Sequence, residues 1–328
     1  MKILSEEIRG GDVHATLLAE REDLARFGGV RPAIEGCIRA FAAKKGLEAL
    51  ALPRVTRMDE SRSDEVTFDF DAAVPPQVEL GEYLGLEVYV PSDEKPDLPV
   101  LLAASENLRA EIPETYISRK TDGLMRQRME DVVRRPVFSA LTDMYAVLRA
   151  ANEALSCGRS DEELWSMALS AADEANGSRF RARSAEDIVS AAASALFPEG
   201  AEERKIETVA DCLARRAEKK RGSSLEQLAE ESFAGYLRMI GKTEATLREE
   251  FRDQATELVR IDLLIDEVAK REGLTISDEE LGAALGKIAE ICDMEPQAVL
   301  EGIGEATLRA QLIRDKARTM IVDSARTF

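Results

Sequence analysis

Hydrophobic and polar residues alternate along the first 90 positions in a way that predicts β-strands. In "EVTFDFDAAV" (65–74), Val66, Phe68 and Phe70 fall on one side and polar residues fall between them. This period of two predicts a strand with one solvated face, as in an antiparallel sheet. The alternating run "DVHATLLA" (12–19) predicts an edge strand, and "GLEVYV" (85–90) predicts a further strand.

A helix is predicted between these strands, in "RPAIEGCIRAFAAKKG" (31–46). Pro32 suits the first helical turn, where its missing N–H is not needed, and Gly46 follows the end of the helix. The polar segment "PSDEKPDLP" (91–99) predicts a linker, because proline and charge interrupt it. Residues 1–92 are therefore predicted to form a small α+β domain.

Residues 93–328 carry apolar positions at steps of three and four, which predicts helices almost throughout. Pro113 should open one helix, and Pro136 should end or kink it. Ser160, Ser224 and Ser277 each stand three residues before a Glu or Gln, the pattern of a capping box at a helix start. The expected fold is mainly α, with the small α+β domain at the N-terminus and an elongated helical body.

The predicted helix over 243–271 is apolar on two faces. Leu247, Phe251 and Ile261 belong to one stripe, whereas Val259 and Leu263 fall on the opposite side. Such a helix is either sandwiched between neighbouring helices or exposes one apolar strip to solvent. Both alternatives stay open at this point.

Charge and composition narrow the classes of partner. The chain has 44 Lys and Arg against 63 Asp and Glu, a formal net charge of −19. A dedicated nucleic-acid binder normally has a net basic surface, so we expect no DNA partner. The charged N-terminal segment lacks the apolar core of a signal peptide, and no window holds 18 uninterrupted apolar residues. We expect a cytoplasmic protein that does not enter a membrane.

The sequence offers little catalytic chemistry. His14 is the single histidine, and it stands in a strand-like run beside no candidate nucleophile. Histidine is the commonest general base and metal ligand, so most hydrolase and zinc schemes are disfavoured. The four cysteines lack C-x-x-C spacing, and no glycine-rich phosphate-binding motif is present. Paired carboxylates occur at helix starts, where capping explains them. We expect no enzyme activity, no cofactor and no bound metal.

Three stretches resemble the trigger factor family, the bacterial ribosome-associated folding chaperones. "DEVTFDFDAAVPPQVELGEYLGLEVYVP" (64–91) is similar to the end of the family's N-terminal domain. "AEIPETYISRKTDGLMRQRME" (110–130) resembles a helix of the chaperone body that opens with I-P-E. Residues 237–325 resemble the C-terminal helices in order and spacing. The resemblance implies a helical chaperone body of the trigger factor C-terminal type.

The chain also departs from the family pattern. The ribosome-docking signature G-F-R-x-G-K is missing from the shortened region "REDLARFGGVRPAIEGC" (21–37), in which only Phe27, Gly28 and Gly29 resemble it. The linker leads almost directly into the I-P-E helix, so the family's prolyl isomerase domain should be absent. Residues 135–222 are predicted to be a helical insertion of unassigned role. Ribosome contact is left open.

The leading hypothesis is an ATP-independent holdase that binds unfolded or nascent polypeptides through apolar patches in a helical cradle. Flexible methionines and aromatic side chains suit varied clients, although ordinary packing between helices is the alternative at each position. The candidate client-binding residues are Met125, Met129, Phe233, Tyr236, Met239, Met294 and Leu300. The acidic balance should keep such a protein soluble and disfavour acidic clients.

The alternative hypothesis is a scaffold or assembly factor for one specific protein partner. The cluster "RKIETVADCLARRAEKKRG" (204–222) contains seven Lys and Arg against three acids. It is either a solvated helix face or an electrostatic docking site for an acidic partner or the ribosome. Its candidate docking residues are Arg215, Arg216, Lys219 and Lys220. The sequence leaves open whether the chain forms a homodimer.

Overall fold

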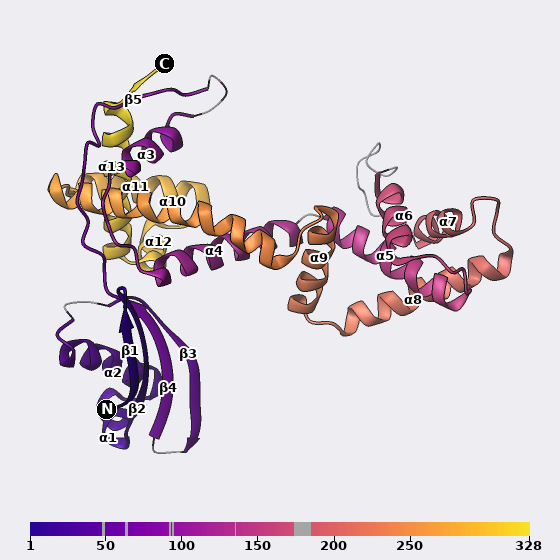
Figure 1. The fold of residues 1–328 in the computed structure, drawn as a ribbon, viewed down its shortest axis with the longest axis horizontal. Helices are drawn as coiled ribbons and strands as arrows, with labels where there is room; N and C mark the ends of the chain where they lie inside the picture. Colours follow the sequence, from indigo (N-terminus) through magenta and orange to yellow (C-terminus); the bar gives the residue numbers. More distant parts are fainter. Residues whose placement is uncertain (48–49, 63–64, 92, 94, 135, 174–184) are drawn as a thin grey trace. The chain divides into compact units, whose positions relative to one another are not determined.

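The computed structural model spans residues 1–328 and describes all of them except 48–49, 63–64, 92, 94, 135 and 174–184 (Figure 1). Contacts divide the chain into two compact units. Unit 1 combines Met1–Thr121 with Arg252–Phe328, and unit 2 is Asp122–Phe251. The fold is mainly helical with a small α+β part at the N-terminus, as predicted from the sequence.

The N-terminal part of unit 1 contains an antiparallel sheet with the strand order β1-β2-β4-β3. Its strands are β1 (Lys2–Arg9), β2 (Asp12–Ala19), β3 (Ala51–Arg62) and β4 (Glu65–Ala73). The prediction that residues 12–19 form an edge strand was wrong, because β2 pairs with β1 on one side and β4 on the other. The edges are β1 and β3, which the sequence pattern did not predict.

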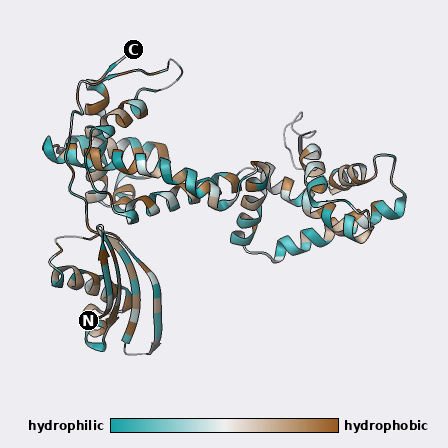
Figure 2. Cartoon of the chain, in the orientation of Figure 1, coloured by the Kyte–Doolittle hydropathy of each residue, from teal (hydrophilic) through white to brown (hydrophobic). Residues whose placement is uncertain are grey.

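Two helices, α1 (Arg21–Phe27) and α2 (Val30–Lys44), cover one face of this sheet (Figure 1). Phe41 of α2 packs edge-on against Phe70 of β4, with ring centroids 5.4 Å apart, and Leu17 completes the buried layer. The other face is polar, as the alternation in β4 predicted. There Thr16 donates a hydrogen bond to Asp69, at 2.7 Å. Figure 2 shows the alternation of hydrophilic and hydrophobic residues along the strands.

The helical part of unit 1 contains one further core. It is built from α3 (Asp97–Glu106), α10 (Glu244–Arg271) and α13 (Glu305–Ser324), with Tyr83 and Val88. Two further helices of this part are α11 (Asp278–Cys292) and α12 (Pro296–Ile303). Val100, Leu264 and Ile321 are among its fully buried side chains. The strand expected at 85–90 is present but short. It is β5 (Glu87–Val88), which pairs in parallel with β6 (Arg326–Thr327).

The apolar positions of α10 are packed along both faces. Leu247 and Phe251 are buried in a core cluster of unit 2. In unit 1, Leu264 and Val268 are buried in the core, Val259 is 3% exposed, and Leu263 packs against the core partly buried. Of the two alternatives for this helix, sandwiching between neighbours therefore describes the structure. The helix does not present a long apolar strip to solvent.

Helix α4 (Glu114–Val133) begins with a cap from a distant part of unit 1. The Asp12 carboxylate, at the first residue of β2, accepts hydrogen bonds from the backbone N–H groups of Glu114 and Thr115 at 3.0 and 2.7 Å. A carboxylate at a helix N-terminus satisfies free N–H donors and the helix dipole together. The helix ends at Val133, and Pro136 opens the next one, as the two prolines predicted.

All regular elements among the described residues of unit 2 are helices. Unit 2 contains α5 (Pro136–Ala154), α6 (Asp161–Asp173), α7 (Ala185–Leu196), α8 (Glu203–Gly222) and α9 (Leu225–Met239), together with the ends of α4 and α10. Trp165 lies in its main core, edge-on to Tyr145, and the Arg238 guanidinium lies 4.9 Å from the centroid of the Trp165 ring. All three predicted capping boxes form, at Ser160, Ser224 and Ser277.

Candidate functional site

A groove of about 720 Å³ lies between α7 and α8 in unit 2. No charged side chain lines it among the described residues, although a third of the whole chain is charged. On the α7 side its wall includes Val189, Ala193 and Phe197, and on the α8 side it includes Ile206 and Leu213, with small residues between them. A concave, apolar surface of this kind binds apolar groups in preference to water.

The groove exists because α7 and α8 are each apolar on two faces. One face of each helix is buried in the main core of unit 2, through Ala192 and Leu196 on α7 and through Val209 and Cys212 on α8. The second face repeats at helical spacing along the groove and stays accessible. A helix with two apolar faces and one packed neighbour leaves the other face for a partner.

A second apolar surface lies in unit 1, at the turn between α11 and α12. Ile291 is 83% exposed and Met294 is 50% exposed, and Ile303 at the end of α12 is 42% exposed. We call this surface the α11–α12 tip. The charged residues between positions 288 and 308 are all acidic: Glu290, Asp293, Glu295, Glu301 and Glu305. The exposed apolar residues of the tip are therefore accompanied along this part of the sequence by acidic residues only.

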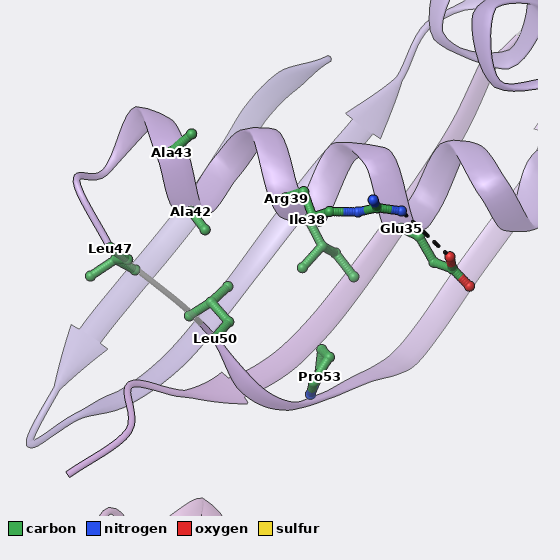
Figure 3. A pocket seen from close by; sticks show the side chains of 8 residues that line it. All are labelled: Glu35, Ile38, Arg39, Ala42, Ala43, Leu47, Leu50 and Pro53. Atoms are coloured by element: carbon green, nitrogen blue, oxygen red, sulfur yellow. Dashed lines mark ion pairs between the residues drawn. The ribbon is translucent and has the colours of Figure 1, made fainter. Parts of the chain in front are cut away.

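A smaller pocket of about 350 Å³ lies beside α2 in the N-terminal part (Figure 3). Ile38 of α2, Leu47 and Leu50 point into it, and Pro53 of β3 forms its lower wall. Glu35 and Arg39, which form an ion pair at 3.8 Å, also line it. An aliphatic or aromatic side chain would fit such a pocket, in which the two charged lining residues, Glu35 and Arg39, are paired with each other.

The structure separates the predicted client-binding residues into two groups. Met125, Phe233 and Tyr236 are buried together in a core cluster of unit 2, and Met129 packs against it half-buried. This burial matches ordinary packing between helices. The exposed members are Met239, which is 41% exposed, and Met294 at the α11–α12 tip, with Leu300 half-buried on α12.

The basic cluster on α8 is largely engaged inside unit 2. Arg216 is 10% exposed and contacts Asp143 of α5 at 3.0 Å and Glu231 of α9 at 2.5 Å. Its guanidinium lowers the pKa of Glu231. Lys220 contacts Asp143 at 2.7 Å, and the more exposed Lys219 contacts Glu231 at 3.5 Å. These pairs connect α8 to α5 and α9.

Arg215 is the most weakly engaged of the four predicted docking residues. Its side chain is exposed, and its polar contacts stay within α8, to the Asp211 carbonyl and the Cys212 sulfur. Of the predicted set, Arg215 and Lys219 are therefore the cations that face solvent.

The polar groups that could have served catalysis lie apart. His14 is exposed on β2 with its Nδ1 2.8 Å from an Asp71 oxygen. Cys37 is buried, which raises the pKa of its thiol to about 11, whereas Cys292 is exposed on α11. Within the described residues, no three His, Cys, Asp or Glu side chains gather closely enough to hold a metal ion. None of the described helices has the length and apolar character needed to cross a bilayer.

The groove between α7 and α8 was not predicted from the sequence. The sequence nevertheless contains the apolar face of α8 that lines it. This face recurs at helical spacing, within the same segment that was interpreted as a basic cluster, through Ile206, Ala210, Leu213 and Ala217. That spacing defines a face of α8, but it does not tell whether a neighbour covers the face. The missing information is the position of α7 beside it.

Comparison with known proteins gives one consistent family. Residues 181–323 match the sequence profile described as bacterial trigger factor protein (TF) C-terminus. This match begins within the segment 135–222 that was predicted to be an insertion. A trigger factor from Caldicellulosiruptor saccharolyticus is 32% identical over 98 residues, which are 29% of this chain and 22% of that protein. The trigger factor of Bacillus subtilis is 32% identical over 90 residues, which are 27% of this chain and 21% of that protein.

Longer matches show the same partial coverage. A trigger factor from Citrifermentans bemidjiense is 33% identical over 130 residues, covering 38% of this chain and 29% of that protein. The chain thus matches less than a third of the length of these relatives. A solved structure from work titled "Promiscuous Substrate Recognition in Folding and Assembly Activities of the Trigger Factor Chaperone" aligns over 98% of this chain and 99% of its own, at 12% identity. Its TM-score of 0.35 is too low to infer a shared overall fold.

Proposed function

We propose that the chain is a trigger factor-like, ATP-independent, holdase-type chaperone of the cytoplasm, because residues 181–323 match the trigger factor C-terminus and its relatives are trigger factors. It binds unfolded or nascent polypeptides by apolar contact and changes no covalent bond. The observation that carries the proposal is the uncharged groove between α7 and α8, which is large enough for several side chains of a client. We also propose the division into residues 1–92 and 93–328 as its head and its chaperone body.

The energetics suit transient holding. Burying about 100 Å² of apolar surface yields on the order of 2.5 kcal/mol, which gives a single contact too weak to last. A client that touches the groove and a second apolar surface on the same chain gains through effective concentration. Weak, separable contacts also release a client without ATP, because each one breaks independently.

We propose further that the chain has no prolyl isomerase activity. In support, α3 and then α4 follow β5 directly among the described residues, without strands of a further sheet between them. Client contact is assigned first to the exposed predicted residues Met239 and Met294. The buried ones, such as Phe233, belong to the packing of a core cluster in unit 2.

A scaffold for one specific partner is the alternative, and the basic cluster on α8 was its main support. Because Arg216 and Lys220 are committed to ion pairs within unit 2, a docking contact would have to rely on Arg215 and Lys219. Two exposed cations make a weak electrostatic site. Client range separates the alternatives, since a holdase protects unrelated proteins and a dedicated scaffold does not.

The test is suppression of light scattering from chemically denatured clients, without ATP, at near-stoichiometric ratios. The wild-type chain should suppress aggregation of several unrelated clients. Ala214→Glu places a charge in the groove at an exposed position, so the fold is kept, and should weaken suppression several-fold. Ala234→Glu, at an exposed position of α9 outside the groove, is the matched control and should act like wild type.

Two results would contradict the proposal. A wild-type chain that protects none of the clients is not a holdase. Equal suppression by Ala214→Glu and wild type would show that the groove is not where clients bind.

A further inference from the structure

Strand β3 is an edge of the N-terminal sheet, and it lies beside the pocket next to α2 (Figure 3). It pairs with β4 on one side, and among the described residues no strand pairs with its other side. An edge strand leaves half of its backbone N–H and C=O groups for water or for another strand. Pro53 of β3 and Ile38 of α2 both line the pocket. Unpaired backbone groups and an apolar pocket therefore lie next to each other.

The helix-covered face of β3 is apolar and partly uncovered. Val55 lies opposite Phe70, a core residue, and Met58 lies opposite Phe68. Met58 nevertheless stays 49% exposed, so the two helices leave this part of the face open to solvent. A strand laid beside β3 would place every second side chain on this face, where apolar side chains fit.

The opposite, polar face of β3 is cationic. Arg54 and Arg57 lie opposite Asp71 and Asp69 of β4. Asp69 also accepts a hydrogen bond from Thr16 of β2, and Arg57 takes part in no ion pair within the described chain. The intervening side chains of an added strand would lie on this face, beside the two guanidinium groups.

The side of β3 that is already paired shows which sequence complements it. There β4 contributes "DFD" (69–71), with its phenylalanine in the core and its two acids opposite the two arginines. The two long sides of a strand share the same side chains, so the pattern that fits one side also fits the other. The surrounding charge agrees, because residues 30–58 contain six Lys and Arg against two Glu, in a chain whose net charge is −19.

We propose that the open edge of β3 binds an extended segment of a partner protein in which acidic and apolar residues alternate. The segment adds a strand to the sheet by backbone hydrogen bonds. Its apolar side chains lie beside Met58 and enter the pocket, and its acidic side chains lie beside Arg54 and Arg57. This inference does not rest on the proposed chaperone function, since it concerns another surface and a defined sequence pattern.

Irregular backbone limits the length of the added strand. Pro53 has no N–H to donate, and Leu52 before it has a left-handed backbone, with φ of 53°. The register with β4 shifts at Thr56 and again after Asp59. Bulges and charges of this kind keep many edge strands from pairing at random. Here they confine pairing to residues 54–59, so the partner segment is short and its pattern decides whether it binds.

Charge decides against other occupants of this edge. A second copy of the chain, pairing its own β3 across a two-fold axis, would bring Arg54 and Arg57 of both copies together, and like charges on neighbouring strands are destabilising. A segment rich in Lys or Arg is repelled for the same reason. A neutral apolar segment gains the pocket but nothing from the guanidinium groups.

The test measures fluorescence anisotropy of labelled peptides with the full chain. Three peptides share phenylalanine at every second position and carry Asp, Asn or Lys between the phenylalanines. At low salt the Asp peptide should bind about fivefold tighter than the Asn peptide, and the Lys peptide should bind most weakly. Equal affinity for the Asp and Asn peptides would overturn the inference.

Two double variants locate the preference. Arg54→Gln with Arg57→Gln should remove most of the preference for the Asp peptide and leave the affinity for the Asn peptide unchanged. Lys2→Gln with Arg9→Gln removes the same charge from exposed positions of β1, the other edge of the sheet, and should keep the preference. Equal loss in both double variants would show that the preference follows total charge, which would overturn the assignment to β3.

A pair of substitutions on α2 tests the pocket. Ala43 lines the pocket and is exposed, so Ala43→Gln obstructs the pocket and keeps the fold. It should weaken the Asp and Asn peptides alike, by several-fold. Ala40→Gln, at an exposed position of the same helix that does not line the pocket, should bind both like wild type. Unchanged affinity in Ala43→Gln would overturn the role of the pocket.

Backbone methylation tests the added strand itself. In an extended strand the N–H groups of successive residues point to opposite sides. The Asp peptide is therefore made in two forms, with N-methyl groups on the odd or on the even residues. One form should lose about tenfold in affinity, because its donors to β3 are removed, and the other should bind like the unmethylated peptide. Two forms that behave alike would overturn strand addition.

Discussion

At the scale of single residues, the requirement for glycine at position 81 cannot be predicted from the sequence. The segment that contains it lies along residues 107–109, where Glu79 and Arg109 exchange backbone hydrogen bonds at 2.9 and 3.0 Å. A Cβ on Gly81 would lie 2.5 Å from the Asn107 carbonyl oxygen and 2.8 Å from the Asn107 Cβ. Nothing in "VELGEYLGLEV" (78–88) distinguishes this glycine from Gly85, because the close approach is a property of the fold.

Alanine at Gly81 should therefore destabilise unit 1. The obstructing atom belongs to the backbone and cannot swing aside, so we expect a loss of about 1–3 kcal/mol in the free energy of unfolding. Gly282 on α11 is the control, since a Cβ there meets nothing within 4 Å. Gly282→Ala should instead add roughly 0.5–1 kcal/mol through helix propensity. Urea unfolding measures the change in the free energy of unfolding for both variants. A change of the same sign in both would contradict the steric argument.

At the scale of elements, the starts and ends of helices were predicted well, whereas the two edge strands were not predicted. The capping boxes and Pro136 act within one helical turn, so neighbours in sequence determine them. Strands β1 and β3 lie at the edges of the sheet, where most side chains stay exposed and no clean apolar alternation is needed. In β3, "ALPRVTRMDESR" (51–62) is mostly polar for this reason, and its bulges disturb the period further.

The capping box at Ser277 makes the stability of unit 1 depend on pH. The Lys316 side chain, 2.8 Å from Glu280, and the Ser277 backbone N–H lower the pKa of Glu280 from 4.5 to about 2. Because the pKa of Glu280 is lower in the folded state than in the unfolded state, the ionised carboxylate stabilises the fold. This stabilisation is complete above pH 4.5 and is lost as the pH falls towards 2. Lys316→Gln should therefore flatten the decline in melting temperature across this window.

Lys287→Gln provides the comparison for that measurement. Lys287 is an exposed residue of α11, the helix that contains Glu280, and it makes no ion pair among the described residues. Lys287→Gln therefore changes the net charge as much as Lys316→Gln does, but it leaves Glu280 with its partner. Its melting temperature should fall with acid as steeply as that of the wild type. A parallel flattening in both variants would assign the effect to total charge and not to Glu280.

At the scale of the whole molecule, surfaces were harder to predict than helices. The sequence indicates which residues are apolar, but burial depends on which helices meet. Phe233 and Tyr236 were predicted to contact clients and are buried in a core, whereas Ile291 was passed over and is exposed. The groove has the same origin, since only the pairing of α7 with α8 turns two apolar stripes into one cavity.

The division into two contact units predicts that they lose structure separately. Each unit has its own buried cores, and Arg216 stabilises unit 2 alone, through Asp143 and Glu231. Arg216→Ala leaves two carboxylates without their partner, which should cost about 1–3 kcal/mol, given that both are partly exposed. Hydrogen exchange should then quicken in α5, α8 and α9, with α11 and α13 unchanged.

Arg309→Ala gives the reciprocal experiment in unit 1. Arg309 joins the start of α13 to Asp278 of α11 and donates to the Ile276 carbonyl at 2.9 Å. Its loss should speed exchange in α11 and α13 and leave α5 and α8 protected. Because α4 and α10 run from one unit into the other, cooperative unfolding of the whole chain is the competing expectation. Faster exchange in both units after either substitution would establish that cooperativity and refute independent units.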